Sequence, residues 1–375
     1  MNNIQMVDLK GQYQKIKNEI DSALLKAVEG AAFINGPEVK QFAENLKQFN
    51  KVQSAVTCAN GTDALQIAMM ALGFKPGDEV IVPAFTYIAT VEVIALLGLI
   101  PLFIDVRADT FELDHAQLEK TITDKTVGIV TVHLFGQCSN MDAIIAIAQK
   151  YKLAVIEDTA QAMGAEYIFR NGAKAFAGTI GNIGTTSFFP SKNLGCFGDG
   201  GALLTQDIEL GEKAHMIANH GQRKKYHHES IGVNSRLDTV QAAILNVKIK
   251  YLNEYSAARQ EVAQKYDEGL AEIEELILPV KASYSTHVYN QYTCRVINDN
   301  RDSLKTYLQD KGIPTMIYYP VPVHLQKAYQ NYGYKEGDFP VAESLCKEVI
   351  SFPIHTEMKA EMQDHIIESI ISFFN

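Results

Sequence analysis

The sequence lacks paired cysteines. Its five cysteines are odd in number and widely spaced, and none belongs to a CxxC motif. They are Cys58, Cys138, Cys196, Cys294 and Cys346. Such a set fits neither a disulfide framework nor a zinc site, so we expect a reducing, cytoplasmic environment and no bound metal. We expect Cys196 to be a small buried hydrophobic side chain.

Long hydrophobic runs are absent too. The most apolar run, residues 93–104, is interrupted by Gly98 and Pro101 and is shorter than the ~20 residues that a bilayer requires. We interpret it as the end of a helix, a turn and a buried strand, and we expect no membrane insertion. The first residues, MNNIQMVDLKGQYQ, contain no basic segment followed by an apolar run, so no signal peptide is predicted.

The chain also has no excess of positive charge. It contains 34 lysines and arginines against 44 aspartates and glutamates, which gives a formal net charge of −10. Nucleic-acid binding requires clustered cations that replace the counterions around the phosphates. We therefore expect no nucleic-acid partner, and any anionic ligand should be small and held locally.

The pattern of apolar residues is that of a globular α/β protein. Apolar residues make up 47% of the chain and charged residues 21%, values near the globular average. From about residue 50 to 205, short β-branched runs alternate with helical patterns, which predicts a mainly parallel sheet covered by helices. Ligands of such sheets bind at the C-terminal ends of the strands.

At 375 residues, the chain is longer than the ~250 to 300 residues at which one hydrophobic core stops growing. We expect a large domain over residues 1–250, with an N-terminal helix over 13–30, and a smaller C-terminal α+β domain over residues 251–375. The helical stretch 237–270 is too long for one ordinary surface helix, and we expect it to bridge the two lobes. The elements expected after it are a strand over 289–297 and helices over 301–312 and 361–374.

One lysine stands in an unusual setting. Lys192 lies in SFFPSKNLGCFGDGG, among aromatic, proline and glycine residues, and Asp158 ends the apolar strand VIED. A nucleophilic lysine and an aspartate for a pyridinium nitrogen are the pair that pyridoxal phosphate chemistry requires. Partial burial would lower the pKa of the lysine, and an ionised aspartate would keep the ring nitrogen protonated. The ordinary alternatives are a solvated loop lysine and a helix N-cap aspartate.

Two further segments suit a phosphorylated aromatic ligand. In CANGTDALQIAMM a strand gives way to a helix at Asn-Gly-Thr, so backbone N–H groups and the Thr62 hydroxyl can face an anion. The alternative is an ordinary helix with Thr62 as its N-cap. In PAFTYIAT, Tyr87 follows a strand and a proline, where it can stack on a ring or be a buried core tyrosine.

With these segments, the sequence resembles the DegT/DnrJ/EryC1/StrS family of pyridoxal-phosphate-dependent nucleotide-sugar aminotransferases. The resemblance runs from FINGPEV at residue 33 through NGTDAL, PAFTYIAT, IEDTAQA, SFFPSKNLG and GDGGA to GVNSRLDTVQAA and YYPVPVHLQ. It implies an aspartate-aminotransferase-like fold (PLP fold type I) and a homodimer with both active sites at the subunit interface.

The resemblance also implies a role for each matching residue. Lys192 would attach the cofactor covalently and act as general base and acid. Asp158 would bind the ring nitrogen, Gln161 would contact the ring hydroxyl, and Tyr87 would stack on the ring. The phosphate-binding residues would be Gly61, Thr62, Ser187 and the partner subunit's Asn234.

The implied activity is transamination, with glutamate as amino donor and pyridoxal 5'-phosphate cycling through pyridoxamine 5'-phosphate. A relative that dehydrates sugars carries a histidine in place of Lys192, so the lysine argues for transamination. The acceptor would be a nucleotide-linked keto sugar for surface polysaccharide or lipopolysaccharide biosynthesis. The segments RKKYHHESIGVNSRLDTVQAAIL and CANGTDALQIAMMALG most resemble enzymes that aminate C3 of a UDP-linked 3-keto-N-acetylglucosaminuronate.

The candidate substrate residues each have a functional and a structural interpretation. Arg236 can bind a sugar carboxylate from the partner subunit, or it can pair with Asp238 or cap the long helix. Tyr318 and Tyr319 stand where the uronate enzymes carry His-Tyr, which removes one cationic contact. His324 can line the sugar pocket or bond a backbone carbonyl. The basic run 220–228 can contact the nucleotide diphosphate or be a solvated loop.

Three other functions compete with this interpretation. An aminotransferase of a 4-keto-6-deoxy nucleotide sugar would place nitrogen on a different carbon. A non-catalytic regulatory or binding protein on the same fold predicts damage to the lysine, the aspartate or the phosphate loop, and all three are intact. A nicotinamide dehydrogenase is disfavoured because no strand is followed by GxGxxG.

Overall fold

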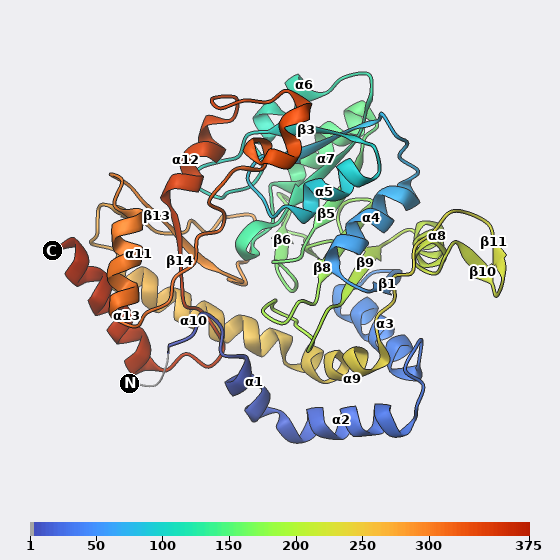
Figure 1. Ribbon diagram of the computed structural model, residues 1–375, viewed down its shortest axis with the longest axis horizontal. Helices are drawn as coiled ribbons and strands as arrows, with labels where there is room; N and C mark the ends of the chain where they lie inside the picture. Colours follow the sequence, from blue (N-terminus) through green and yellow to red (C-terminus); the bar gives the residue numbers. More distant parts are fainter. Residues whose placement is uncertain (1–3) are drawn as a thin grey trace.

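A computed structural model describes residues 4–375 as an α/β protein built on a seven-stranded sheet (Figure 1). The strands of this sheet are β1 (Ser54–Cys58), β2 (Glu79–Pro83), β3 (Ile100–Ile104), β4 (Thr126–Val132), β5 (Ala154–Asp158), β8 (Ile183–Ser187) and β9 (Gly201–Thr205). Their order is β1-β9-β8-β5-β4-β2-β3. All neighbouring strands are parallel except β9, which runs antiparallel to both β8 and β1. The expected α/β class with a mainly parallel sheet is confirmed.

Helices cover both faces of the sheet. The α-helices are α1 (Leu9–Lys15), α2 (Lys17–Glu29), α3 (Pro37–Asn50), α4 (Gly61–Leu72), α5 (Ala89–Leu96), α6 (Leu118–Thr121), α7 (Met141–Tyr151), α8 (Ile208–Ala218), α9 (Thr239–Lys248), α10 (Leu252–Leu270), α11 (Arg301–Asp310), α12 (Pro340–Glu348) and α13 (Ala360–Phe374). Alternate strand residues point to opposite faces. Val80 and Val130 belong to the core that includes α4, α5 and α8, whereas Ile81 and Ile129 pack with α7.

Helix α4 illustrates how local sequence sets the element ends. Asn60 has an extended backbone, and its side chain accepts a hydrogen bond from Asp63 N at 2.8 Å, which is the N-cap arrangement. Gly73 ends the helix at φ +83°, a left-handed conformation that glycine adopts without a steric penalty. Because α4 follows β1, which is parallel to β8, its N-terminus lies at the end of the sheet where the parallel strands finish.

Two expected helical segments are each divided. The N-terminal segment forms α1 and α2, which meet at Ile16. The stretch 237–270 forms α9 and α10, separated by a 3-10 turn over Ile249–Tyr251. The division lets α9 pack on α2 and α3 while α10 packs on α13. By contrast, residues 93–104 fold as interpreted, because α5 ends at Leu96, Gly98 adopts φ +70° and β3 follows.

The C-terminal part of the chain contains a second sheet. Its strands are β12 (Leu276–Ile277), β13 (Tyr292–Val296) and β14 (Val349–Phe352), and both pairings are antiparallel. They enclose a separate hydrophobic core with α10, α11 and α13, which confirms the expected strand and both helices. Residues of 323–349 pack instead against the core of the large sheet. The division at residues 250 and 251 remains a prediction.

Two small hairpins complete the fold. The first pairs β6 (Glu166–Ile168) with β7 (Lys174–Phe176), and the second pairs β10 (Gln222–Lys224) with β11 (His227–His228). The second hairpin carries the basic run and projects from the body of the molecule (Figure 1). Over residues 4–375, no helix has both the length and the apolar character to cross a membrane, and no three metal-ligating side chains gather in one place.

Candidate functional site

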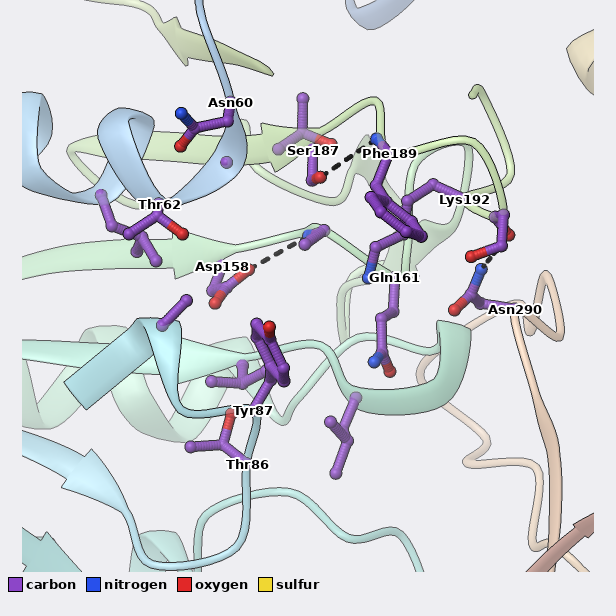
Figure 2. Close-up of a pocket in the computed structure, with 18 of the residues that line it drawn as sticks. Asn60, Thr62, Thr86, Tyr87, Asp158, Gln161, Ser187, Phe189, Lys192 and Asn290 are labelled. Atoms are coloured by element: carbon purple, nitrogen blue, oxygen red, sulfur yellow. Dashed lines mark hydrogen bonds between the residues drawn. The ribbon is translucent and has the colours of Figure 1, made fainter. Parts of the chain in front are cut away.

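A cavity of about 610 Å³ lies where the parallel strands end (Figure 2). The strands β5 and β8 contribute their last residues to it, α4 contributes its N-terminus, and the segments after β2 and β8 form further walls. The sequence-predicted residues that line it are Gly61, Thr62, Tyr87, Asp158, Gln161, Ser187, Lys192, Tyr318 and Tyr319. Residues far apart in the sequence therefore meet in one cavity.

Lys192 projects into this cavity from the loop after β8. The backbone of the loop turns back on itself, since Lys192 N donates to Phe189 O at 2.8 Å and Cys196 N donates to Phe188 O at 2.8 Å. Burial lowers the pKa of Lys192 to about 8, although attraction to the Asp158 carboxylate acts in the opposite direction. Most of the amine still carries its proton at pH 7, but the neutral fraction is far larger than for a lysine with the ordinary pKa of 10.5, which favours a nucleophile or proton carrier.

Asp158 is fixed by hydrogen bonds at both carboxylate oxygens. The Thr90 hydroxyl donates to Oδ2 at 2.8 Å, and Ala160 N donates to Oδ1 at 3.1 Å. The side chain is buried and lines the cavity at the end of β5. No helix starts here, because Ala160 to Gly164 form turns, so the N-cap alternative for Asp158 is wrong. Each oxygen keeps lone-pair capacity for a donor in the cavity.

Gln161 and the aromatic residues form one side of the cavity. Gln161 Oε1 accepts a hydrogen bond from Phe135 N at 2.6 Å, and its Nε2 donates to the Tyr319 hydroxyl at 3.2 Å. Tyr87 is 56% exposed, so it is not the core tyrosine that was the alternative for this position. Its ring lies 6.0 Å from that of Tyr319, measured between centroids. Burial raises the pKa of Tyr319, which keeps its hydroxyl neutral.

The N-terminus of α4 lies opposite these side chains and forms a cradle for an anion. Asn60, rather than Thr62, caps the helix, so the Thr62 hydroxyl is not used as the cap. The first N–H groups of a helix have no acceptor within the helix, and Gly61 and Thr62, the first two residues of α4, line the cavity. A Cβ on Gly61 would lie 2.7 Å from the Ser187 Cβ, so only glycine allows this close approach.

Three predicted residues lie away from this cavity within the same chain. Asn234 is exposed and forms a β-bridge with Asn219. Arg236 lines a second cavity of about 270 Å³, which also includes Lys40. His324 is buried and lies 3.1 Å from Glu343 through its Nε2, so its partner is a carboxylate rather than a backbone carbonyl. The role of Asn234 toward the cofactor phosphate and the roles of Arg236 and His324 toward a substrate remain predictions.

Sequence reasoning missed several residues of the site. Thr90, which holds Asp158, lies on α5, and nothing in its local sequence indicates that contact. Asn60 carried a usable signal, because an asparagine between a strand and a helix is a strong N-cap. Asp199 and Asn290 also line the cavity, and Asn290 donates to Ser191 O at 3.4 Å, beside Lys192 (Figure 2).

The residues in the cavity fit pyridoxal phosphate. The amine of Lys192 suits the aldehyde, and the carboxylate of Asp158 suits the ring nitrogen. The α4 N-terminus suits the phosphate, because the gap between Gly61 and Ser187 leaves room only for a backbone without a side chain. The exposed face of Tyr87 and the amide of Gln161 suit the ring and its hydroxyl.

Comparisons with known proteins support this assignment. The profile of the DegT/DnrJ/EryC1/StrS aminotransferase family matches residues 14–371. A "Pleiotropic regulatory protein" of Geobacillus stearothermophilus is 43% identical over 99% of both chains. The UDP-2-acetamido-2-deoxy-3-oxo-D-glucuronate aminotransferase of Pseudomonas aeruginosa is 44% identical over 94% of this chain and 95% of its own.

Solved structures are similar over nearly the whole chain. The crystal structure of S. venezuelae DesV in complex with a ketimine intermediate has a TM-score of 0.96 and 38% identity, and it covers 100% of this chain and 99% of its own. The structure of NtdA from Bacillus subtilis, with bound cofactor PMP, has a TM-score of 0.89 and 31% identity over 96% of this chain and 82% of its own. The chain belongs to the DegT/DnrJ/EryC1/StrS aminotransferase family.

Proposed function

We propose that this protein is a pyridoxal-phosphate-dependent aminotransferase of a nucleotide-linked keto sugar, and that nitrogen is introduced at C3. The observation that carries the proposal is the meeting of Lys192 and Asp158 in one cavity beside the α4 N-terminus. The C3 position is supported by the Pseudomonas relative, which is named as a 3-oxo sugar aminotransferase. The intact lysine, aspartate and phosphate cradle argue against a purely regulatory role despite the name of the Geobacillus relative.

Bound pyridoxal phosphate would supply a protonated pyridine ring, which withdraws electrons from the carbon that carries the reacting nitrogen. The Asp158 carboxylate holds the proton on the ring nitrogen. The Lys192 amine would act as the general base and acid that moves the proton of the substrate carbon, and its pKa of about 8 favours this role near neutral pH. The Gly61 and Thr62 N–H groups and the Ser187 hydroxyl would bind the phosphate, and Tyr87 would stack on the ring.

We also propose that the protein acts as a homodimer in the cytoplasm, with glutamate as amino donor. Phe33 and Ile34 are about half exposed, at 49% and 50%, and Ile34 forms a β-bridge with Asp238. An apolar patch thus adjoins the segment of Asn234 and Arg236, as an interface would require. In such a dimer the partner subunit's Asn234 would bind the phosphate. The five unpaired, buried cysteines suit a reducing compartment.

Arg236 is the residue that would distinguish a uronate from a neutral sugar. Within residues 4–375 it forms no ion pair with Asp238, and no side-chain hydrogen bond caps the N-terminus of α9, so the two structural alternatives for Arg236 have no support. A free guanidinium suits a carboxylate in bidentate geometry. Tyr318 and Tyr319 line the cavity and would contact the sugar, whereas His324, bonded to Glu343, would act on it only indirectly.

The test is an absorption spectrum of the purified protein with pyridoxal phosphate, before and after addition of glutamate. We expect a visible band that glutamate removes and that one member of a panel of keto nucleotide sugars restores. Lys192→Ala should abolish the band and the turnover, while the surface variant Lys174→Ala should keep both. A folded wild-type protein without the band would overturn the proposed function.

A further inference from the structure

Lys248, at the end of α9, is a buried lysine that has no carboxylate partner among residues 4–375. Its side chain is 2% exposed, and the charged or titratable groups that act on it are Cys196 and Arg259, neither of which is an acid carboxylate. Lysines are almost never fully buried unless they are paired. Burial accordingly lowers the pKa of Lys248 to about 8. Such a costly arrangement calls for a specific role.

The contacts of Lys248 lie in the loop that carries Lys192. Its Nζ donates a hydrogen bond to the Gly195 carbonyl at 2.5 Å, and it lies 5.7 Å from the centre of the Phe197 ring. Gly195 follows Lys192 by three positions in SKNLG. A hydrogen bond between an ammonium group and a carbonyl is stronger than one between neutral groups. The contact therefore restrains the C-terminal end of this loop.

The rest of the loop is restrained by neutral contacts. Gly195, at one end of the loop, packs closely against Pro190, at the other end. An added Cβ on Gly195 would lie 2.3 Å from Pro190 O. Asn193 Nδ2 donates to Val288 O at 3.0 Å, and Asn290 Nδ2 donates to Ser191 O at 3.4 Å. Contacts thus hold the loop both before and after Lys192 in the sequence. Among these contacts, the one to Lys248 involves a charged group.

We propose that Lys248 is a positioning residue. Its ammonium group holds the Gly195 carbonyl and thereby fixes the loop that carries Lys192. The fixed loop sets how far the Lys192 amine is shielded from water. The contact is a property of the loop in the protein without cofactor. Its importance for transamination rests on the proposed role of Lys192.

The experiment measures the reactivity of Lys192 directly. In the cofactor-free protein, competitive amine acetylation across a pH series, read by mass spectrometry of the Lys192 peptide, gives the midpoint of its titration. Lys248→Met removes the charge and the donor and keeps an unbranched apolar side chain that is one atom shorter. We expect its Lys192 midpoint to rise by about one pH unit, because a loosened loop admits water and so weakens the burial that lowers the pKa of Lys192. Cofactor affinity should fall on the order of tenfold with it.

Two further variants complete the test. Lys250→Met removes an exposed lysine that pairs with Glu19, and it should leave the Lys192 midpoint unchanged. Lys248→Arg keeps the charge, but its larger planar head displaces the Gly195 carbonyl, so we expect a smaller rise of the same sign. A wild-type midpoint in whichever Lys248 variant folds would overturn the proposal. The outcome could also separate the two proposals. If the Lys248 variants shift the Lys192 midpoint but Lys192→Ala leaves cofactor binding unchanged, the positioning role of Lys248 stands and the proposed role of Lys192 in cofactor attachment is rejected.

Discussion

Both oxygens of the Asp158 carboxylate accept hydrogen bonds from the protein itself. The contribution of one donor, the Thr90 hydroxyl, can be tested by substitution. Thr90→Val removes the hydroxyl that donates to Oδ2 with little change in side-chain volume. We expect the free energy of unfolding to fall by about 1 to 3 kcal/mol, because a buried carboxylate oxygen loses a donor. We also expect kcat/KM to fall on the order of tenfold, because the carboxylate that faces the ring nitrogen becomes less fixed.

Chemical denaturation and steady-state kinetics measure the two effects of the Thr90 substitution. Thr90→Ser is the matched control, since it keeps the hydroxyl and should retain most of both quantities. If the valine variant equals the wild type in stability and in kcat/KM, the contact between Thr90 and Asp158 has no part in the site.

Gly61 gives a second prediction for a single residue. Gly61→Ala forces the N-terminus of α4 and the end of β8 apart, because the new Cβ would lie 2.7 Å from the Ser187 Cβ. We expect the dissociation constant of pyridoxal phosphate to rise on the order of tenfold, because its phosphate loses aligned N–H donors. Gly198→Ala is the control, since its Cβ would meet mainly the flexible Gln241 side chain. Equal affinity of the Gly61 variant and the wild type, measured by fluorescence titration, would contradict the assignment of the phosphate site.

Among the elements, α4 depends on its cap. Asn60→Ala leaves Asp63 N without its acceptor, so we expect a loss of about 1 kcal/mol in the free energy of unfolding. Asn60→Ser restores an acceptor and should recover most of the stability, whereas Asn60→Asp should recover the stability but weaken phosphate binding through its negative charge. Denaturation and cofactor titration of the three variants separate these effects. Equal stability of the alanine and serine variants would show that the cap does not matter.

Strands β4 and β5 are joined to the segment before β8 by a buried carboxylate. Glu157 accepts hydrogen bonds from His133 Nε2 at 2.8 Å and from the N–H groups of Gly178 and Gly181. Burial by itself would raise the pKa of Glu157, but these hydrogen bonds hold it below its ordinary value of 4.5. His133 Nδ1 accepts a hydrogen bond from Ser139 N, so the ring proton is on Nε2. This Nε2–H group donates the hydrogen bond to the Glu157 carboxylate.

This pKa shift predicts a pH dependence of stability. Because the pKa of Glu157 is lower in the folded protein than in the unfolded chain, its stabilisation is fully present above pH 4.5 and is lost as the pH falls through the folded-state pKa. Glu157→Gln should cost about 3 kcal/mol at pH 7 and make stability less dependent on pH below 4.5. Denaturation between pH 3 and 7 measures both, with the exposed Glu119→Gln as control. An unchanged acid dependence in the Glu157 variant would contradict the shift.

For the whole molecule, the central prediction is that each site needs two subunits. Lys192→Ala and Asn234→Ala should each be inactive alone. After denaturation and refolding of an equal mixture, about half of the dimers are mixed, and one of their two sites combines Lys192 with the partner's Asn234. We therefore expect recovery of about a quarter of the wild-type activity. Two variants within the same site, Lys192→Ala and Asp158→Ala, should not complement each other. No recovery in the first mixture would remove Asn234 from the site.

Several site residues that the sequence predicted lie close to the ends of strands. Lys192, Asp158, Ser187, Gly61 and Thr62 lie in short motifs at strand ends, and the alternation of strands and helices already indicated a parallel sheet. Strands that run parallel bring their carboxyl ends to one edge, so motifs far apart in the sequence must converge there. The α/β class, the C-terminal strand and helices, and part of the cavity lining could therefore be predicted without coordinates.

Only the tertiary structure decided the contacts that cross between elements. The chain gave no local sign that Thr90 holds Asp158, that His324 pairs with Glu343 or that Lys248 reaches Gly195. Local patterns report periodicity, caps and turns, because these depend on neighbours in the sequence. Side-chain partners depend on how close-packed elements meet, and that is fixed by the shape of the whole core rather than by any one segment.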